Sequence, residues 1–454
     1  MPLARFSVGN YRCFPGTQEV ELRPITVILG KNNSGKSALV RAPLVFQTGI
    51  RTDSPLPLDL DQLGESAPDF LNLVHGGSPH GNVRLRLDFE RVGAAPHSLS
   101  AEIQNVDEWG VQVVSRLILS AGSESTDVEW LDWLDQQEEP GLRDPADGYS
   151  YVVPGMADAQ GPAVATLPFR GLLPAVRYDD DLELVHDGPD RQAVACSDEP
   201  DLHGLVAAMA VIRAEFDDIR YLGPFRQRPR RVHRLRSRAS SVVGSGGELT
   251  MDILAHDSLR RGGALTSKIN EYLAANLPGW KLAVRDHDQG VYTAVLRSTG
   301  NSGLEVNLAD AGAGVTQLLP ILTQRAVDAV TPPRRPTLEI IEEPELHLHP
   351  SAHALLADLF LGAIGESQVR FLIETHSETF LLRLRRRIAE GAVDHEDVAV
   401  YFVENTDGAA NARRIRIDSL GNLDYWPRGV FAEDFEETRA LASAQFGRSE
   451  ADAS

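Results

Sequence analysis

The feature that most constrains this chain is a glycine-rich motif near its start. Residues 30–37 read Gly-Lys-Asn-Asn-Ser-Gly-Lys-Ser and match G-x-x-x-x-G-K-[ST] in full. An apolar run, residues 25–29, precedes the motif, and helix-favouring sequence follows it to about residue 46. This strand–loop–helix context is the one in which the motif binds phosphate. A glycine-rich turn that fits by accident is the alternative, and the flanking strand and helix argue against it.

Each residue type in this loop has a chemical reason. The glycines let backbone N–H groups wrap phosphate oxygens, and the start of the following helix adds a positive dipole end. We expect Lys36 to reach the β- and γ-phosphates of ATP, and the Ser37 hydroxyl to bind Mg²⁺. The loop residues predicted to bind the nucleotide are Gly30, Asn32, Asn33, Ser34, Gly35, Lys36 and Ser37.

Two adjacent acids follow an apolar run in the last third of the chain. Residues 338–341 are apolar apart from Glu339, and Glu342 and Glu343 come next. Acids at the C-terminal end of a parallel strand face the ligand crevice. We therefore predict that Glu342 holds Mg²⁺, directly or through water, and that Glu343 orients or deprotonates the attacking water. A solvated strand end is the alternative, which the complete phosphate loop disfavours.

A second apolar run, residues 369–373, ends in Glu374-Thr375-His376-Ser377. His376 would point into the same crevice and sense the γ-phosphate by donating a hydrogen bond. The alternative is a helix-capping segment with Thr375 or Ser377 as the N-cap, and both interpretations can hold together.

Three histidines, His347, His349 and His353, follow the acid pair. Their spacing fits no standard zinc site, and no cysteine supports one. A polar turn at a subunit contact is therefore the preferred interpretation over a structural metal.

The arrangement of apolar segments predicts three parts. Residues 1–132 form an N-terminal lobe with an antiparallel β subdomain, and residues 133–300 an insertion that includes helices near 202–216 and 267–277. In residues 301–454, apolar strands alternate with helices near 315–330, 351–364 and 378–390. This alternation indicates a parallel sheet covered on both faces. The fold class predicted is α/β.

Composition narrows the cellular setting and the partners. The net charge is −21, so contact with nucleic acid requires a local basic patch. Only two cysteines occur, and no apolar run approaches the ~20 residues that cross a bilayer. The N-terminus lacks the pattern of a signal peptide. We expect a cytoplasmic protein without membrane contact.

One basic patch is present. Eight arginines and His233 lie between Arg220 and Arg238, with no acid among them. The segment predicts either nucleic-acid contact or pairing with acids of this chain or of a partner. Aromatic residues occur only at one end, as Tyr221 and Phe225, so base stacking is not indicated.

These elements, in this order, resemble the ABC-type ATPase heads of the SMC/RecF/OLD superfamily. The matching segments are an N-[FY]-R-x-F turn within residues 5–14, Walker A at 30–37, Y-L-G-P-[LF]-R at 221–226, a signature-type loop at 311–317, Walker B and D-loop at 342–350, a switch histidine at 375–377 and a W-P-x-G-F-F-type ending at 425–431. The L-S-G-G-Q signature itself is absent, and residues after His376 contain no Asp-x-Asp of a Toprim nuclease.

The resemblance implies an ABC-type P-loop ATPase head split by a long mixed α/β insertion. Two such heads would sandwich ATP as a homodimer or higher oligomer, with the signature-type loop of one chain closing over the nucleotide of the other. The residues it adds to the nucleotide site are Arg12, Gly312, Gly314 and Thr316.

Three functions remain open at this stage. The first is the sensor or motor subunit of a bacterial anti-phage defence system, acting with a separate nuclease or toxin. The second is a DNA-repair clamp that acts directly on DNA. The third is a scaffold that uses ATP without hydrolysis, which the intact Glu343 argues against.

Overall fold

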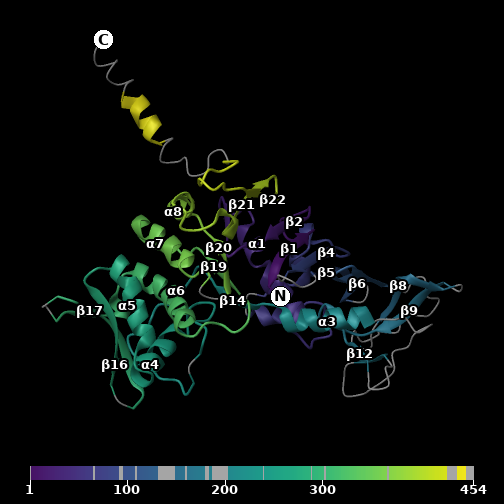
Figure 1. Cartoon of the computed structure of the whole chain (residues 1–454), viewed down its shortest axis with the longest axis horizontal. Coiled ribbons are helices and arrows are strands. Elements are labelled where there is room, and N and C mark those ends of the chain that lie inside the picture. The colour runs from purple at the N-terminus through teal and green to yellow at the C-terminus, as the bar shows by residue number, and fades with distance from the viewer. Residues whose placement is uncertain are drawn as a thin grey trace, which may run out of the picture.

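A mixed, mostly parallel sheet forms the centre of the computed structural model (Figure 1). The structure describes residues 2–64, 67–90, 96–107, 110–130, 149–158, 161–178, 184–186, 203–238, 240–287, 289–300, 303–365, 368–426 and 437–445. The strand order is β14-β19-β20-β3-β21-β22, with all neighbours parallel except the β21–β22 hairpin. The strands are β14 (Asp218–Leu222), β19 (Thr337–Glu342), β20 (Val369–Glu374), β3 (Ile25–Gly30), β21 (Val398–Thr406) and β22 (Ala409–Ile415).

Side chains of the central strands alternate between two cores. In β3, Ile25 and Val27 face one apolar cluster and Ile28 faces the other. In β20, Phe371 joins the first cluster and Leu372 the second. Burial on both faces explains why these strands read as continuous apolar runs in the sequence.

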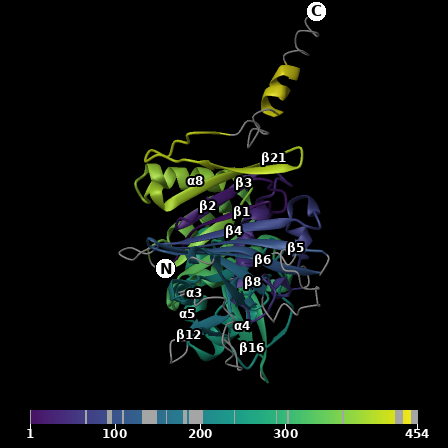
Figure 2. The ribbon, with the colours of Figure 1, turned by 90° about the vertical axis from the view of Figure 1, so that its right-hand side faces the viewer.

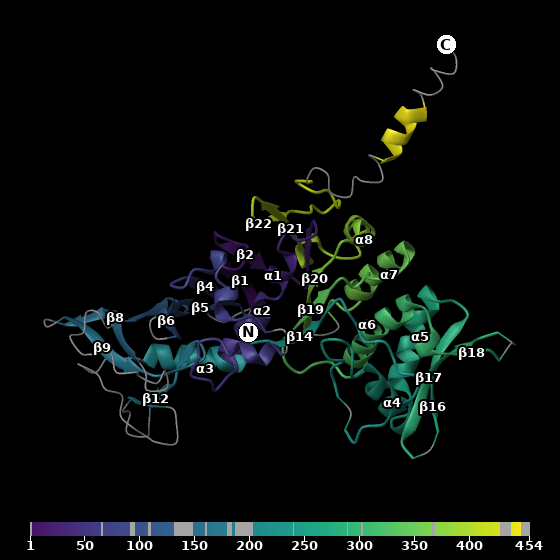
Figure 3. The same cartoon turned by 180° about the vertical axis from the view of Figure 1, so that it is seen from behind.

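Helices cover one face of this sheet. They are α4 (Thr250–Arg260), α5 (Ala264–Asn276), α6 (Ala313–Val330), α7 (Pro350–Leu361) and α8 (Glu378–Ala389). A small sheet lies beyond α4 and α5 (Figure 3) and consists of β15 (His233–Arg234), β17 (Val291–Ser298), β16 (Trp280–Asp286) and β18 (Glu305–Asn307).

The opposite face packs against an antiparallel sheet, seen from the side in Figure 2. In the described residues its order is β2 (Gln18–Glu21), β1 (Leu3–Gly9), β4 (Asn82–Phe89), β5 (His97–Val106), β6 (Val111–Ala121), β7 (Glu124–Trp130), β8 (Tyr149–Asp158) and β9 (Gly161–Leu167). The helices on this side are α1 (Lys36–Val40), α2 (Ala42–Ile50) and α3 (His203–Glu215).

Shorter elements complete the described chain. The paired strands are β10 (Phe169–Arg170) with β11 (Leu173–Pro174), and β12 (Val176–Tyr178) with β13 (Leu184–His186). The 3₁₀ turns are η1 (Leu60–Leu63), η2 (Phe70–Asn72), η3 (His75–Gly77), η6 (Leu308–Asp310) and η7 (His395–Asp397). No helix within the described residues is long and apolar enough to cross a membrane.

The structure differs from the predicted layout in two places. The antiparallel sheet continues through β9, so the predicted boundary after residue 132 falls inside one sheet. Strand β14 lies within the predicted insertion, yet it pairs with β19 at the edge of the central sheet. An edge strand buries only part of its surface, and β14 accordingly lacks the apolar run that identifies its neighbours.

Two helical regions also differ from the prediction. The sequence predicts one helix after the phosphate loop, but α1 ends at Val40 and α2 begins at Ala42, with Pro43 in its first turn. Proline favours a helix start because it lacks the N–H that a continuing helix needs. Helix α4 was not predicted; its buried residues include Asp252, His256 and Asp257, so its burial does not follow an apolar pattern in the sequence.

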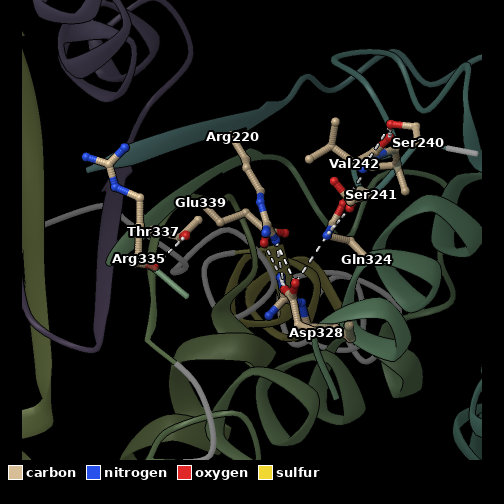
Figure 4. Close-up of polar contacts among 11 residues, drawn as sticks. Arg220, Ser240, Ser241, Val242, Gln324, Asp328, Arg335, Thr337 and Glu339 are labelled. Atoms are coloured by element: carbon tan, nitrogen blue, oxygen red, sulfur yellow. Dashed lines mark hydrogen bonds and ion pairs between the residues drawn. The ribbon is translucent and has the colours of Figure 1, made fainter. Parts of the chain in front are cut away.

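A buried ion network ties the arginine segment to the central sheet (Figure 4). Arg220 of β14 donates to both carboxylate oxygens of Asp328 in α6, at 2.7 and 3.0 Å. Arg325 of α6 bridges Asp328 and Glu339, the single acid within the apolar part of β19. Because buried charges are tolerated only when paired, Glu339 is explained by this contact. Arg220 therefore has a structural role and does not belong to the predicted nucleic-acid-binding patch.

Candidate nucleotide and metal site

The phosphate loop follows β3 and is held in place from two sides. Gly30 and Gly35 have φ angles of 155° and 105°, which favour glycine. A Cβ on Gly30 would lie 2.5 Å from the carbonyl oxygen of Val403 in β21. A Cβ on Gly35 would lie 2.5 Å from Sγ of Cys13. The two glycines therefore serve close packing against β21 and against the N-terminal turn.

The Lys36 side chain reaches across the phosphate loop. Its Nζ donates to the carbonyl oxygen of Lys31 at 2.7 Å, and the residue is 4% exposed. Burial lowers the pKa of Lys36, and the negative charges of Glu374, Glu343 and Glu345 act in the opposite direction. A buried ammonium with one protein acceptor has donors left for phosphate oxygens.

The buried hydroxyl of Ser34 also lacks a hydrogen-bond partner within the described chain. Unpaired buried polar atoms are rare, and one in this loop fits a site that binds oxygen-rich groups.

The ends of β19 and β20 bring two carboxylates together. The parallel register places Glu342 beside Glu374. Both carboxylate oxygens of Glu342 accept from Arg41, at 2.5 and 2.6 Å, and the Glu342 side chain is 2% exposed. The Arg41 guanidinium also lies over the ring of Tyr221, 5.6 Å from its centroid. Glu342, which the sequence predicts to hold Mg²⁺, is thus paired with an arginine that the sequence analysis did not identify.

Glu374 is the carboxylate that faces the phosphate loop. The Ser37 hydroxyl donates to its Oε1 at 3.0 Å, while its Oε2 is buried without a partner in the described residues. Burial raises the pKa of Glu374 to about 7, and the nearby charge of Glu342 adds to this. The sequence analysis did not assign this role to Glu374. The pattern that could have identified it is an acid at the end of an apolar strand, the same pattern that identified Glu342.

Glu343 lies in a strained turn at the mouth of the site. Its φ is 44°, and its N–H donates to the carbonyl oxygen of Glu374 at 2.8 Å. Its Oε1 is 3.9 Å from Nε2 of His376. Burial, followed by the charge of Lys36, lowers the pKa of His376 to about 4. The imidazole is therefore neutral near pH 7 and has one N–H to donate.

The described part of the chain contains one group of side chains able to hold a metal ion: Glu343, Glu374 and His376, whose ligand atoms lie within 4.8 Å of one another. Two carboxylates with the Ser37 hydroxyl beside them are hard oxygen donors, which suit Mg²⁺. The unpaired Oε2 of Glu374 points to the same conclusion. The residues present fit the metal that a P-loop ATPase requires.

The neighbouring motif residues support this turn from beneath. Arg226 donates to the backbone oxygens of Glu342 and Glu343, at 2.8 and 3.3 Å. The carboxylate of Glu345 accepts from the N–H of His376 at 2.6 Å. Ser377 accepts from the N–H of Phe380 and caps α8, as one of the two sequence alternatives proposed.

The three histidines after the acid pair do not converge on a metal. His349 caps α7 by accepting from the N–H of Ser351. His353 contacts Ser377 and the carbonyl oxygen of Leu348. His347 is exposed in a turn with a φ of 63°. These separate contacts form a polar turn, and its place at a subunit contact stays a prediction.

Arg12 lies in the turn that packs against Gly35. Its N–H donates to the carbonyl oxygen of Leu73, and its own carbonyl oxygen contacts Nδ1 of His75. The Nε of Arg12 is buried without a partner in the described chain. The Arg12 guanidinium lies over the ring of Tyr11, 5.8 Å from its centroid, and its contact with the nucleotide stays a prediction.

The signature-type loop begins α6, with Gly312 exposed and with Ala311 and Val315 packed against the core. A Cβ on Gly312 would meet nothing within 4 Å, whereas one on Gly314 would lie 3.0 Å from the carbonyl oxygen of His347. The Thr316 hydroxyl is turned back onto its own helix and donates to the carbonyl oxygen of Ala313 at 2.9 Å. Of the two glycines assigned to this loop, only Gly312 would leave open space around an added Cβ.

Family comparisons agree with this geometry. Residues 261–381, which contain the signature-type loop, the acid pair and His376, match the AAA ATPase domain family. Residues 393–441 match a family described as a protein of unknown function (DUF3696). The W-P-x-G-F-F-type ending falls in this second match, but its residues 427–431 lie outside the described part of the structure. No protein of curated function matches the chain in sequence.

Several SMC head structures are similar in fold. An SmcHead bound to the C-winged helix domain of ScpA is 11% identical with a TM-score of 0.47, covering 92% of this chain and 98% of that one. An SMC head from Thermotoga maritima is 13% identical with a TM-score of 0.39, covering 92% and 100%. An Smc head with an extended coiled coil bound to the C-terminal domain of ScpA, derived from Pyrococcus furiosus, is 10% identical with a TM-score of 0.45, covering 91% and 96%.

At these scores the SMC structures add nothing to what the chain itself establishes. The sheet order, the phosphate loop after a central strand and the AAA ATPase domain match define an α/β P-loop ATPase.

Proposed function

We propose that the chain hydrolyses ATP between two copies of itself. The observation that carries the proposal is the exposed start of α6: the phosphate loop lies beside Glu374, whereas a Cβ on Gly312 of the signature-type loop would meet nothing within 4 Å. A loop with no substrate of its own is useful if it closes over the nucleotide of a second head. The resemblance to dimerising ATPase heads supports the same arrangement.

Within each site, the residues have separate tasks. Lys36 and the loop N–H groups hold the phosphates, and Glu343 orients or deprotonates the attacking water. Neutral His376 donates a hydrogen bond toward the γ-phosphate. Ser37 and Glu374 would hold Mg²⁺, which neutralises phosphate charge when bound, while Glu342 is held by Arg41.

From the resemblance of its motifs, we propose that the chain is the sensor or motor subunit of a bacterial anti-phage defence system, working with a separate nuclease or other effector. A DNA-repair clamp is the second candidate, because unpaired arginines lie beside α6. Reconstitution with the product of the neighbouring gene separates the two. Nuclease or toxin activity that depends on ATP supports defence, and the absence of such activity supports the clamp.

Two substitutions test the shared ATP site. Glu343→Gln should slow hydrolysis by at least roughly 100-fold, the usual effect of losing a general base. It should also trap an ATP-bound dimer, which analytical ultracentrifugation detects. Gly312→Glu should leave ATP binding unchanged but abolish that dimer, because an added Cβ at this exposed position meets nothing within 4 Å in its own chain. A Gly312→Glu chain that still dimerises and hydrolyses ATP normally contradicts the shared site.

A further inference from the structure

A second anion-binding feature lies outside the ATP site. A pocket of about 720 Å³ opens between the arginine segment, the start of α4 and the first half of α6. Its lining includes Arg228, Arg230, Arg234 and Arg236, and also Thr316 of the signature-type loop. A volume of this size is typical of ligand sites.

About half of the positive charge in this pocket is uncompensated, since four arginines stand against two acids in its lining. Arg236 pairs with Asp252 at 2.8 Å, and the other acid in the lining, Glu248, accepts from the N–H of Gly246. Among the described residues, no acidic partner is found for Arg228, Arg230 or Arg234, and all three are exposed. A chain with a net charge of −21 thus leaves several arginines unpaired in one place.

We propose that this pocket binds the phosphate backbone of a single nucleic-acid strand. Exposed, unpaired arginines spaced along an extended segment suit successive phosphates better than one compact anion. The sequence pattern did not indicate base stacking, but Phe225, three residues before Arg228 and outside the pocket lining, is 84% exposed and offers a flat surface for one base. The ring of His233 is stacked on Tyr292, with centroids 5.2 Å apart, and is not available for this purpose.

The pocket is connected to the ATP site through backbone and side-chain contacts. Arg231 pairs with Asp310, immediately before the signature-type loop, at 2.6 and 2.9 Å. Gln317 of α6 donates to the carbonyl oxygen of Arg226, whose guanidinium holds the turn at Glu343. A bound strand would therefore alter the ATP hydrolysis rate, and this part of the inference rests on the proposed function.

The test measures binding of a fluorescently labelled oligothymidylate of about 20 nucleotides to the full chain by anisotropy at several salt concentrations. Replacing Arg228, Arg230 and Arg234 with serine should weaken binding at least 10-fold. The slope of log affinity against log salt should fall by about 2, for three lost phosphate contacts on a single strand. Phe225→Ala should weaken binding roughly 5-fold without changing that slope.

A charge-matched control replaces Arg84, Arg260 and Arg261, which are exposed and lie outside this pocket. Equal losses in the two triple variants, or no binding by the unaltered chain, overturn the proposed site. Displacement of the strand by micromolar tripolyphosphate also overturns it, in favour of a compact anion. Retained binding of labelled ATP shows that each variant is folded.

Hydrolysis rates with and without the strand test the connection. A change in the unaltered chain that disappears in the Arg228/Arg230/Arg234 variant supports it, and an unchanged rate overturns it. Absence of ATP hydrolysis under all conditions refutes the proposed function instead, so the two failures are distinguishable.

Discussion

The ATP site and the arginine pocket both present cations to an anion, but they hold them in different ways. Lys36 is 4% exposed and surrounded by Glu343, Glu345 and Glu374. Arg228 and Arg230 are exposed and have no acidic partner among the described residues. A buried charge is fixed in place and weakly screened, whereas an exposed charge is mobile and sensitive to salt. The first arrangement suits catalysis, and the second suits adaptable binding.

The largest expected effect concerns the buried cation itself. Lys36→Ala should weaken ATP binding roughly 100-fold, since it removes one partner of a buried, hydrogen-bonded charge pair. Isothermal titration calorimetry measures the change, and Lys281→Ala, an exposed lysine, is the matched control. If both substitutions reduced the affinity for ATP equally, buried Lys36 would contribute no more to ATP binding than an exposed lysine. The contrast between buried and exposed cations would then be lost.

The next effect concerns the buried acid beside Ser37. Glu374 has a pKa of about 7 in the folded chain against an ordinary value of 4.5. Its contribution to stability is therefore present below pH 4.5 and is lost as pH rises to about 7. Relative to the unaltered chain, Glu374→Gln should gain up to about 3 kcal/mol in unfolding free energy across this window.

Urea denaturation at several pH values, with chelator and without nucleotide, measures that difference. A constant difference across the window would contradict the buried, protonated state of Glu374. The same variant should bind Mn²⁺ with nucleotide roughly 10-fold more weakly, measured by electron paramagnetic resonance. Unchanged Mn²⁺ affinity would leave Glu374 without a role toward the metal.

A smaller effect is expected at the arginine that holds Glu342. Arg41→Met leaves the carboxylate of Glu342, 2% exposed, without its partner. Because the Arg41 side chain is itself 41% exposed and water can partly replace it, we expect a loss of about 2 kcal/mol rather than the larger cost of a fully buried pair. Adding Glu342→Gln should restore most of that stability. No recovery in the double variant would show that Arg41 acts through other contacts, such as Tyr221.

The smallest effect is expected in the pocket. Replacing Arg228, Arg230 and Arg234 with serine should change the unfolding free energy by less than about 0.5 kcal/mol, because exposed residues without partners contribute little. Thermal denaturation measures this directly. A marked loss would mean that these arginines form structural contacts, as Arg220 does with Asp328.

The sequence predicted local features of the fold more reliably than its boundaries. Strands β3, β19 and β20 were located within one residue at each end, because burial on both faces leaves a continuous apolar run. The domain boundary predicted after residue 132 is wrong, because the sequence of an antiparallel strand does not show which sheet the strand joins. Strand β14 was missed because an edge strand need not be apolar.

The same division applies to the site. By itself, the sequence determined the phosphate loop and the acids that end two strands, since a glycine turn before a helix and an acid after an apolar run are local patterns. Only the tertiary structure decided that Arg41 takes Glu342 and that Ser37 turns to Glu374. These partners are 301 and 337 residues apart in the chain. Which carboxylate meets which donor depends on the order of parallel strands in the sheet, and no local pattern encodes that order.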